Sequence, residues 1–434
     1  MDYQTAVAYL ESLVDYERKV PGAEARQWNL ERISQLLADV GNPHHRLRAI
    51  HVAGTKGKGS TAALLASVLH AAGHATGLYA SPHVESAFER IAIAGEPPRR
   101  DLLARLGREV KAAIDALPPE GVPGHFLPTT FELYTLLAFL YFREAGCEEA
   151  VVETGIGGRL DATNVVLSET AVITPLDLEH TDVLGDTLEE IAFEKAGIIK
   201  PGAPAFVGFQ APEAKAVFVK ACRERGCALS FLDEEVHDLA PRTDREGTSF
   251  TLRLSGELPV DFRLSMLGDF QAENAALAYL ALRRTRPEIT LEQFREGFRS
   301  TTLPGRMEVR GSGPVIVLDG AHTPLAVTRL LASFHSVFPG EAVLLFGSVS
   351  GKKPREMAEI LAPAFTRVVI STPGRFKESN PREVAAIFAA LNPGTVLEED
   401  PGRALERARL ESGGNRPILV TGSFYMVSEI RKLL

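Results

Sequence analysis

Apolar residues along this chain follow two alternating patterns. Short runs rich in β-branched residues give way to longer segments in which apolar positions recur every three or four residues. The short runs predict strands, and the longer segments predict amphipathic helices. In the first half of the chain, helical patterns cover residues 1–40 and 60–72, and the strand candidates are residues 49–54, 75–80, 149–153, 170–174 and 204–209. Such alternation predicts a mainly parallel sheet with helices on both faces.

The pattern changes near residue 250 and restarts after residue 310. Residues 249–254 and 259–267 predict a small β addition, and residues 268–284 predict a long amphipathic helix. A turn-rich stretch at 301–310 follows, and strand and helix then alternate again to the C-terminus. The second series has predicted strands at 314–319, 342–346, 367–371 and 417–423, and predicted helices from residue 324, near 354–364, at 381–391 and at the C-terminus.

These patterns predict an α/β protein with two domains. The first, at residues 1–300, has a mainly parallel sheet with helices on both faces and includes the N-terminal helices. A linker at 301–306 leads to a smaller, Rossmann-like α/β domain at 307–434. The second domain has a size typical of an independent unit.

Composition narrows the functional classes. Hydrophobic residues make up 45% of the 434 positions and charged residues 24%, which excludes a wholly disordered chain. The net charge of −9 argues against a general nucleic-acid binder. No run reaches the 18 apolar residues of a membrane helix, and the N-terminus lacks the apolar core of a signal peptide. Three cysteines match neither a disulfide framework nor a zinc site, so we expect a reducing compartment and a cytoplasmic protein. We also expect a monomer.

The strongest chemical signal is HVAGTKGKGST at residues 51–61, where a predicted strand enters a glycine-rich turn that opens a helix. Such a turn cradles phosphates with backbone N–H groups, and Lys58 adds a positive charge. The motif departs from the usual P-loop because Gly59 separates the lysine from Ser60 and Thr61. The alternative is an ordinary glycine-rich turn, but the combination favours a P-loop-type, nucleotide-binding domain.

A second signal is VVETGIGGRLDATN at residues 151–164. Glu153 ends an apolar strand, so we place it at the carboxyl edge of the sheet, where ligands of open α/β sheets bind. A carboxylate there suits Mg²⁺. A solvated glutamate at a strand end is the alternative. The glycines do not form a dinucleotide fingerprint, because the third glycine position is Leu160.

The third signal lies at residues 174–202. His180 follows a predicted strand by a few residues, and by itself it would more often be structural. Lys195 shares a predicted helical face with Leu188, Ile191 and Ile199, which points it inward. A buried lysine is costly unless it is paired or chemically altered. The alternative is that Lys195 extends along the surface into solvent.

Weaker candidates lie at other predicted strand ends and in loops. Ser81 could offer a hydroxyl to a metal, and Arg90 lies in a loop that runs to Pro98 and could cover a substrate. Lys352 and Lys353 are expected to be solvated. The remaining candidates are Asp161, Asn274, Arg306, Asp319, His322, Ser423 and Tyr425.

Seven motifs, in order, carry a resemblance to a known family. They are GTKGKGS, SPH, ETGIGGRLDATN, LEHTDVLGDTLEEIAFEKAGIIK, GDFQAENAALA, LPGRME and DGAHTP. From about residue 48 to residue 430 the chain resembles folylpolyglutamate synthase and dihydrofolate synthase, of the Mur ligase superfamily. Gly59 is shared with the folate branch, whereas other Mur ligases usually have a hydroxyl residue there.

The resemblance implies a role for each candidate residue. ATP phosphates would bind at Gly54, Thr55, Gly57, Lys58, Gly59, Ser60 and Thr61, and ATP would also be contacted by Asn274, Arg306 and Asp319. One Mg²⁺ would be bound by Ser81 and Glu153, and a second by Glu153, His180 and a carbamylated Lys195. Substrate contacts would come from Arg90, Asp161, Ser423 and Tyr425, with His322 near the incoming glutamate. The catalytic residues would be Lys58, His180, Lys195 and His322.

The expected function is therefore an ATP-dependent amide ligase that adds L-glutamate to folate, and also to dihydropteroate, through an acyl phosphate. One alternative is a Mur-type ligase that acts on a peptidoglycan precursor. Another is a regulatory P-loop protein, although the chain lacks an NKxD guanine-binding signature.

Overall fold

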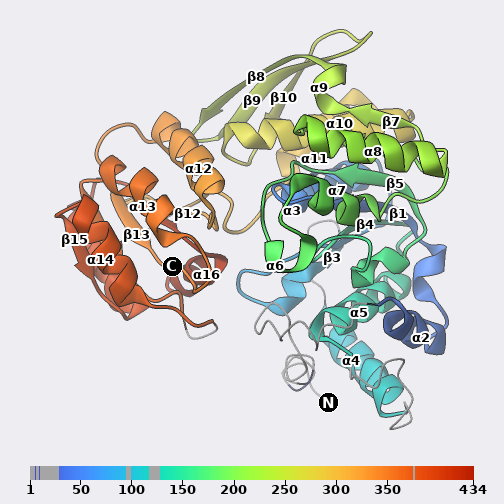
Figure 1. The fold of residues 1–434 in the computed structure, drawn as a ribbon, viewed down its shortest axis with the longest axis horizontal. Coiled ribbons are helices and arrows are strands. Elements are labelled where there is room, and N and C mark those ends of the chain that lie inside the picture. Colours follow the sequence, from blue (N-terminus) through green and yellow to red (C-terminus); the bar gives the residue numbers. More distant parts are fainter. Residues whose placement is uncertain (1–4, 6–8, 10–28, 94–98, 117–127, 375–376) are drawn as a thin grey trace.

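The computed structural model describes Thr5, Tyr9 and residues 29–93, 99–116, 128–374 and 377–434 (Figure 1). Most of the helical region expected before residue 29, and the end of the loop that runs to Pro98, lie outside the described residues. Within them, none of the helices has the length and apolar character needed to cross a bilayer.

The N-terminal domain is built on a seven-stranded sheet. Its order is β3-β2-β4-β1-β5-β6-β7, and every neighbouring pair is parallel except β2 and β3. The strands are β1 Arg48–Ala53, β2 Thr76–Tyr79, β3 Ile91–Ile93, β4 Glu149–Glu153, β5 Ser168–Ile173, β6 Ala205–Val207 and β7 Leu229–Phe231. This confirms the mainly parallel sheet predicted from the alternating pattern.

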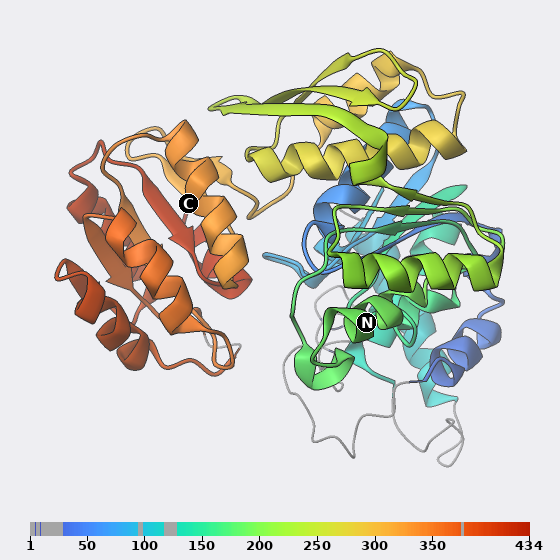
Figure 2. The ribbon, with the colours of Figure 1, turned by 45° about the horizontal axis from the view of Figure 1, so that its top comes forward.

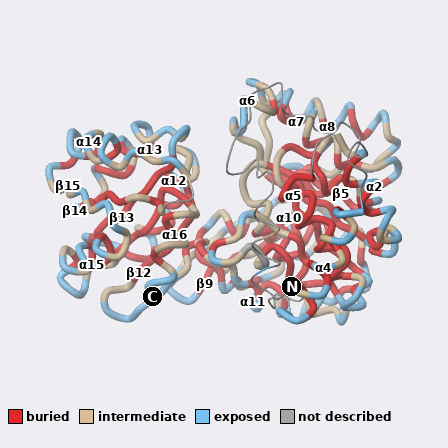
Figure 3. The backbone as a smooth tube through the Cα atoms, turned by 90° about the horizontal axis from the view of Figure 1, so that it is seen from below, coloured by how far each residue is buried: buried red, intermediate tan, exposed pale blue. Residues whose placement is uncertain are grey.

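Both faces of this sheet are covered, because side chains on successive strand residues point to opposite faces. Ile50 and Val52 pack with α3 Lys58–Ala71, α10 Asp269–Thr285 and α11 Leu291–Ser300. Ala49 faces α2 Glu31–Asp39, α4 Arg100–Asp115 and α5 Thr130–Glu144, and Ala53 faces α7 Leu188–Ala196 and α8 Pro212–Arg225. Two short helices, α6 Thr181–Leu184 and α9 Leu232–Glu235, complete the domain. Figure 3 shows buried backbone through the middle of this unit.

A three-stranded antiparallel sheet packs beside α10. Its order is β10-β9-β8, with β8 Val236–Asp244, β9 Gly247–Leu254 and β10 Val260–Leu264. The sequence predicted only the two strands β9 and β10. It missed β8 because that strand is mostly exposed and contains Pro241, which is tolerated on an edge strand.

The C-terminal domain has a six-stranded sheet, in the order β11-β12-β16-β13-β14-β15, that is parallel except for β11. Its strands are β11 Glu308–Arg310, β12 Ile316–Leu318, β13 Val343–Phe346, β14 Arg367–Ile370, β15 Thr395–Leu397 and β16 Ile418–Thr421. One face packs on α12 Pro324–Val337, α13 Pro354–Leu361 and α14 Pro381–Leu391, and the other on α15 Pro401–Ser412 and α16 Phe424–Arg431. The α/β fold in two domains is thus as expected.

The C-terminal domain stands beside the larger unit and meets it at α10 and the three-stranded sheet (Figures 1 and 2). It also contacts the loops of the first domain: Val84 packs in the core around α16, and Glu85 forms an ion pair with Arg431. Arg329 on α12 forms a two-point ion pair with Glu273 on α10 at 3.0 and 3.1 Å. Arg245, at the β8–β9 turn, lies 5.5 Å from the ring centroid of Phe338. This arrangement turns the carboxyl ends of both parallel sheets toward a shared space.

Candidate functional site

A cavity of about 960 Å³ lies between the two domains. Its walls include the loops that follow β1, β2, β4 and β5 in the first sheet and β12, β13 and β16 in the second. Helix α10 and Arg306 of the linker complete it. Ligands of open α/β sheets bind at the carboxyl ends of strands, so each sheet presents its ligand-binding edge to this cavity.

The phosphate loop between β1 and α3 requires glycine at two positions. Gly54 has φ +147°, and a Cβ there would lie 1.9 Å from Thr174 Oγ1. Gly57 has φ +87°, and a Cβ there would lie 2.3 Å from Asn274 Oδ1. The loop can therefore approach both β5 and α10 only because these side chains are absent.

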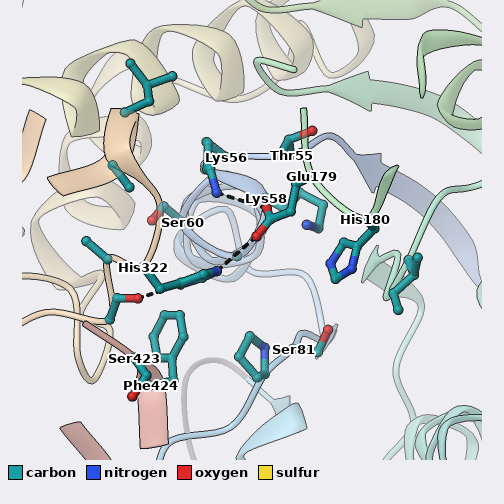
Figure 4. Close-up of a pocket in the computed structure, with 18 of the residues that line it drawn as sticks. Thr55, Lys56, Lys58, Ser60, Ser81, Glu179, His180, His322, Ser423 and Phe424 are labelled. Carbon is teal, nitrogen blue, oxygen red and sulfur yellow. Dashed lines mark hydrogen bonds and ion pairs between the residues drawn. The ribbon is translucent and has the colours of Figure 1, made fainter. Parts of the chain in front are cut away.

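Helix α3 begins at Lys58, two residues before the predicted start at Ser60. Gly59 therefore lies in the first turn, where a Cβ would be 3.4 Å from Glu153 Oε2. Thr55, Lys58 and Ser60 line the cavity (Figure 4). Gly54 and Thr61 do not line it, and Thr61 is buried behind the loop.

Glu153 and Ser81 meet at the carboxyl ends of adjacent strands. The backbone N–H of Ser81 donates to Glu153 Oε2 at 2.9 Å. Burial raises the pKa of Glu153, against the opposing charges of Lys58 and Arg306. The alternative of a solvated glutamate is excluded, because Glu153 is only 2% exposed.

His180 stands at the start of α6 with φ +55°, a left-handed conformation that is uncommon for a residue other than glycine. Its ring lines the cavity (Figure 4). His180 is exposed at the cavity mouth, yet partial desolvation lowers its pKa to about 4, and Glu179 opposes this shift. His180 is therefore neutral near pH 7 and has a nitrogen lone pair to offer a ligand.

Lys195 is 4% exposed, which excludes the surface-reaching alternative. Its Nζ donates to the carbonyl of Gly54 at 2.7 Å, so it supports the phosphate loop from behind the cavity wall. Burial, with the nearby charge of Lys58, lowers the pKa of Lys195 to about 7. Helix α7 ends at Ala196, so Ile199, which the pattern placed on the same helical face, lies beyond the helix.

The structure does not bring Asp161 to the cavity. Asp161 is 2% exposed, and its carboxylate accepts hydrogen bonds from the backbone N–H groups of Gly155, Ile156 and Thr163 and from the Thr163 hydroxyl. The sequence predicted that Asp161 contacts the substrate directly, and the position of its buried carboxylate contradicts that prediction. Asp161 is fully engaged in shaping the loop that follows β4.

Three residues that we expected to contact the nucleotide line the cavity wall outside the phosphate loop. Asn274 lines the cavity, and its Nδ2 donates to Gln271 Oε1 at 2.9 Å. The guanidinium of Arg306 lies 4.2 Å from the ring centroid of Phe424. Asp319 accepts from the backbone N–H groups of Met307 at 2.9 Å and Ala321 at 2.8 Å. Burial raises the pKa of Asp319, and Arg306 opposes that shift.

The remaining candidates also reach the cavity. Arg90 is buried, donates from Nε to His83 Nδ1 at 3.1 Å and lies 5.5 Å from the ring centroid of Tyr134. Ser423 caps α16, and its hydroxyl donates to the Gly347 carbonyl at 2.9 Å. His322 and Tyr425 line the cavity from the C-terminal domain.

The cavity residues that sequence reasoning missed include Lys56, Glu179, Lys352 and Phe424. Lys352 was expected to be solvated, but it pairs with Glu179 across the cavity, whereas Lys353 is exposed as expected. Two signals were available: Lys56 lies inside the glycine-rich motif, and Glu179 is an acidic residue directly before His180. Its partners could not be found from the sequence because they come from distant segments.

The donor set fits Mg²⁺ only if phosphate oxygens or water complete it. Among the described residues, no three His, Cys, Asp or Glu side chains gather closely enough to hold a metal by themselves. Glu153, His180 and Ser81 nevertheless line the same cavity as the phosphate loop. Mg²⁺ is usually bound in this way, by one or two carboxylates together with substrate phosphates and water.

Comparison with known proteins gives the same two-part division. Residues 52–282 match the Mur ligase middle domain, and residues 305–424 match the Mur ligase glutamate ligase domain. The Bacillus subtilis dihydrofolate synthase/folylpolyglutamate synthase is 34% identical, covering 93% of this chain and 94% of that one.

Two further comparisons extend over nearly all of this chain. A probable bifunctional folylpolyglutamate synthase/dihydropteroate synthase of Haloferax volcanii is 34% identical over 99% of it, and the match spans only 50% of that longer protein. A solved FPGS–AMPPCP–folate complex superposes with a TM-score of 0.84 at 31% identity, covering 100% of this chain and 99% of that one.

Proposed function

Because the chain belongs to the folylpolyglutamate synthase and dihydrofolate synthase family of Mur ligases, we propose that it is an ATP-dependent ligase that joins L-glutamate to folate. The observation that carries the proposal is the shared cavity, in which a phosphate loop faces the loops of a glutamate-ligase-type domain. We propose that it acts as a monomer, since one chain supplies both walls. We place it in the cytoplasm, where Cys147, Cys222 and Cys227 would stay reduced.

The reaction must overcome the low electrophilicity of a carboxylate. One carboxylate oxygen of the folate attacks the γ-phosphorus of ATP, ADP leaves, and an acyl phosphate forms. The α-amino group of glutamate then attacks the acyl carbon and loses a proton, and inorganic phosphate departs with the oxygen that attacked. An acyl phosphate hydrolyses readily, so an enclosed cavity between two domains serves to exclude water.

The phosphate loop would hold the nucleotide, with Lys58 near the transferring group. Its charge would offset negative charge that builds up during phosphoryl transfer. Asn274, Arg306 and Asp319 would contact ATP from α10, the linker and the second domain. His322, Ser423 and Tyr425 would border the entering glutamate. Arg90, in the loop after β2, would contact the folate.

Two Mg²⁺ ions, when bound, would neutralise charge on the transferring phosphoryl group. Ser81 and Glu153 would hold one, and Glu153, His180 and a carbamylated Lys195 the other. The lowered pKa of Lys195 supports the carbamate, because only a neutral amine takes up CO₂. The carbamate would also replace a buried cation with oxygen ligands.

We propose that dihydropteroate is a second acceptor. The similarity to a B. subtilis protein named for both activities supports this, and the H. volcanii relative is also described as bifunctional, with a different partner activity. The competing acceptor is a peptidoglycan precursor. Gly59 argues against it, because other Mur ligases usually have a hydroxyl residue at that position.

The test is ADP formation by the purified protein with Mg²⁺, ATP and L-glutamate. Tetrahydrofolate, dihydropteroate and a UDP-muramoyl acceptor would be compared in parallel. The proposal predicts turnover with the first two and none with the third. Turnover only with the muramoyl acceptor would assign the chain to cell-wall synthesis. A constant ATPase rate with every acceptor would favour a regulatory nucleotide-binding protein.

A further inference from the structure

Glu179 occupies the middle of the cavity between the two domains. It lies in the loop between β5 and α6, and its side chain is 12% exposed. In Figure 4 its carboxylate points toward Lys56 of the phosphate loop and toward His322. The function proposed above gives this residue no role.

Three basic side chains converge on this one carboxylate. Oε2 accepts from Lys56 Nζ at 2.9 Å, while Oε1 accepts from His322 Nε2 at 3.0 Å and Lys352 Nζ at 3.3 Å. Burial alone would raise the pKa of Glu179. The hydrogen bond from His322 and the charges of Lys56 and Lys352 outweigh burial and hold that pKa well below its usual range.

These partners come from both domains. Lys56 belongs to the phosphate loop, whereas His322 follows β12 and Lys352 follows β13 in the C-terminal domain. The Arg329–Glu273 ion pair also crosses between domains, but it joins one arginine to one carboxylate. Glu179 instead ties two loops of the second domain to the phosphate loop.

The same contact fixes the ring of His322. Its Nδ1 is 2.8 Å from the carbonyl of Gly320, and its Nε2 is 3.0 Å from Glu179. Both partners are hydrogen-bond acceptors, so the ring donates to both only when each nitrogen has a proton, and the neutral ring that burial favours donates to one of them at a time. The ring of Phe424 flanks it edge-on, with centroids 6.1 Å apart.

Without Glu179, this region would bring like charges together. Lys56 and Lys58 on one wall would face Lys352 on the other, and like charges at short range oppose one another. A carboxylate among them reverses the sign of that interaction. Its position between the walls makes it a fixed internal anion in a cavity otherwise suited to anionic ligands.

We infer that Glu179 is a positioning residue that gathers Lys56, His322 and Lys352 and so holds the C-terminal domain over the phosphate loop before nucleotide binds. The consequence for ligation rests on the proposed function, whereas the contact between domains does not. Glu179→Gln keeps the size of the side chain and one acceptor oxygen but removes the charge. Lys352→Met removes one partner from the opposite domain.

Small-angle scattering of the nucleotide-free protein tests the contact without any assay of activity. Both Glu179→Gln and Lys352→Met should have a larger radius of gyration than the unmodified protein when nucleotide is absent. With AMPPCP and Mg²⁺, both variants should reach the radius of the nucleotide-bound unmodified protein. Glu341→Gln is the matched control, because it removes a surface ion pair with Arg416 within one domain. Equal radii for all four nucleotide-free proteins would overturn the inference.

Steady-state kinetics then distinguish a positioning role of Glu179 from a general loss of structure in the variants. Glu179→Gln should lower kcat roughly ten- to a hundredfold while the KM for folate stays within about twofold, since displaced groups act on the chemical step. The double variant with Lys352→Met should be no slower than the slower single variant. Strictly additive losses, or an unchanged kcat, would contradict the role of Glu179. An unmodified protein without ligase activity would refute the proposed function and leave the scattering result standing.

Discussion

At the scale of single residues, titratable groups in the cavity and directly behind its wall have pKa values that desolvation shifts. Glu153 has a raised pKa, His180 a pKa of about 4 and Lys195 a pKa of about 7. Perturbed groups of this kind cluster at functional sites because catalysis needs protonation states that water would not favour. Here each shift begins with burial, and neighbouring charges then modify it.

Lys58→Ala should abolish turnover while leaving the fold intact. Lys58 lines the cavity at the first residue of α3, and removing one charge that acts in the transition state costs about 3 kcal/mol. ADP formation measures the loss, and unchanged thermal unfolding shows that the fold is kept. Lys353→Ala, which removes an exposed lysine, is the control. Retention of more than about a tenth of the activity, a loss under about 1.4 kcal/mol, would contradict the assigned role.

Lys195→Ala should lose activity, and a small carboxylate such as acetate should restore part of it by supplying the missing oxygens. The pKa of about 7 adds a pH dependence: the neutral amine that takes up CO₂ dominates above that value, so carbamate formation should fall as pH drops below it. Bicarbonate-dependent mass spectrometry follows the modification itself. Lys200→Ala is the matched control, since that half-buried lysine has a pKa of about 8 and donates to Asn164.

Full activity of Lys195→Ala would show that no carbamate is needed at this position. An equal effect of acetate on Lys195→Ala and Lys200→Ala would show the same. The hydrogen bond from Lys195 to the Gly54 carbonyl would then be its whole function.

At the scale of elements, the conformation of the loops at strand ends depends on a few residues, and these lie close together in the sequence. The sequence predicted the phosphate loop because the glycines at 54 and 57 and the flanking strand and helix are visible together. It also predicted Lys195 to face inward, from helical periodicity. It did not predict β8, whose exposed residues lack a clear apolar face, nor the first turn of α3 at Lys58.

The hydrogen-bond partners of Asp161 and Glu179 were beyond sequence reasoning for a different reason. A carboxylate in a loop can face a ligand, a backbone or another domain with equal ease. Asp161 proved to bind its own loop, and Glu179 proved to bind groups 123, 143 and 173 positions away. Such contacts depend on how the elements pack, which local patterns do not encode.

Asp161→Ala should lower stability rather than substrate affinity alone. It would leave the N–H groups of Gly155, Ile156 and Thr163 without their acceptor, and each lost charge-assisted hydrogen bond costs about 1.5–3 kcal/mol. Urea unfolding should therefore show a lower midpoint, with Asp161→Asn losing less because it keeps an acceptor oxygen. A raised KM for folate with an unchanged urea midpoint would instead indicate that Asp161 contacts the substrate directly.

At the scale of the whole molecule, two α/β units share one reaction space, and neither has all the groups that the reaction needs. The first domain has the phosphate loop, Ser81, Glu153 and His180, and the second has Asp319 and His322. Arg306 joins them from the linker, where its guanidinium stacks on Phe424 of α16. Nucleotide binding and domain closure should therefore be coupled.

Arg306→Ala should weaken that coupling. Small-angle scattering of the unmodified protein should show compaction on adding AMPPCP and Mg²⁺, and the variant should compact less and have a higher KM for ATP. Arg310→Ala is the control, since that exposed arginine follows in β11 and pairs with Glu308. Normal activity and normal compaction in Arg306→Ala would show that closure does not pass through the linker.

If the cavity joins glutamate to folate through an acyl phosphate, one oxygen of the folate carboxylate must end in inorganic phosphate. Tetrahydrofolate labelled with oxygen-18 in its glutamyl carboxylates, incubated with ATP, Mg²⁺ and L-glutamate, makes that transfer measurable. Because the attacking carboxylate oxygen leaves with the phosphate, mass spectrometry should find one labelled oxygen in inorganic phosphate for each amide bond formed. Label in AMP, or phosphate released without label, would contradict the account.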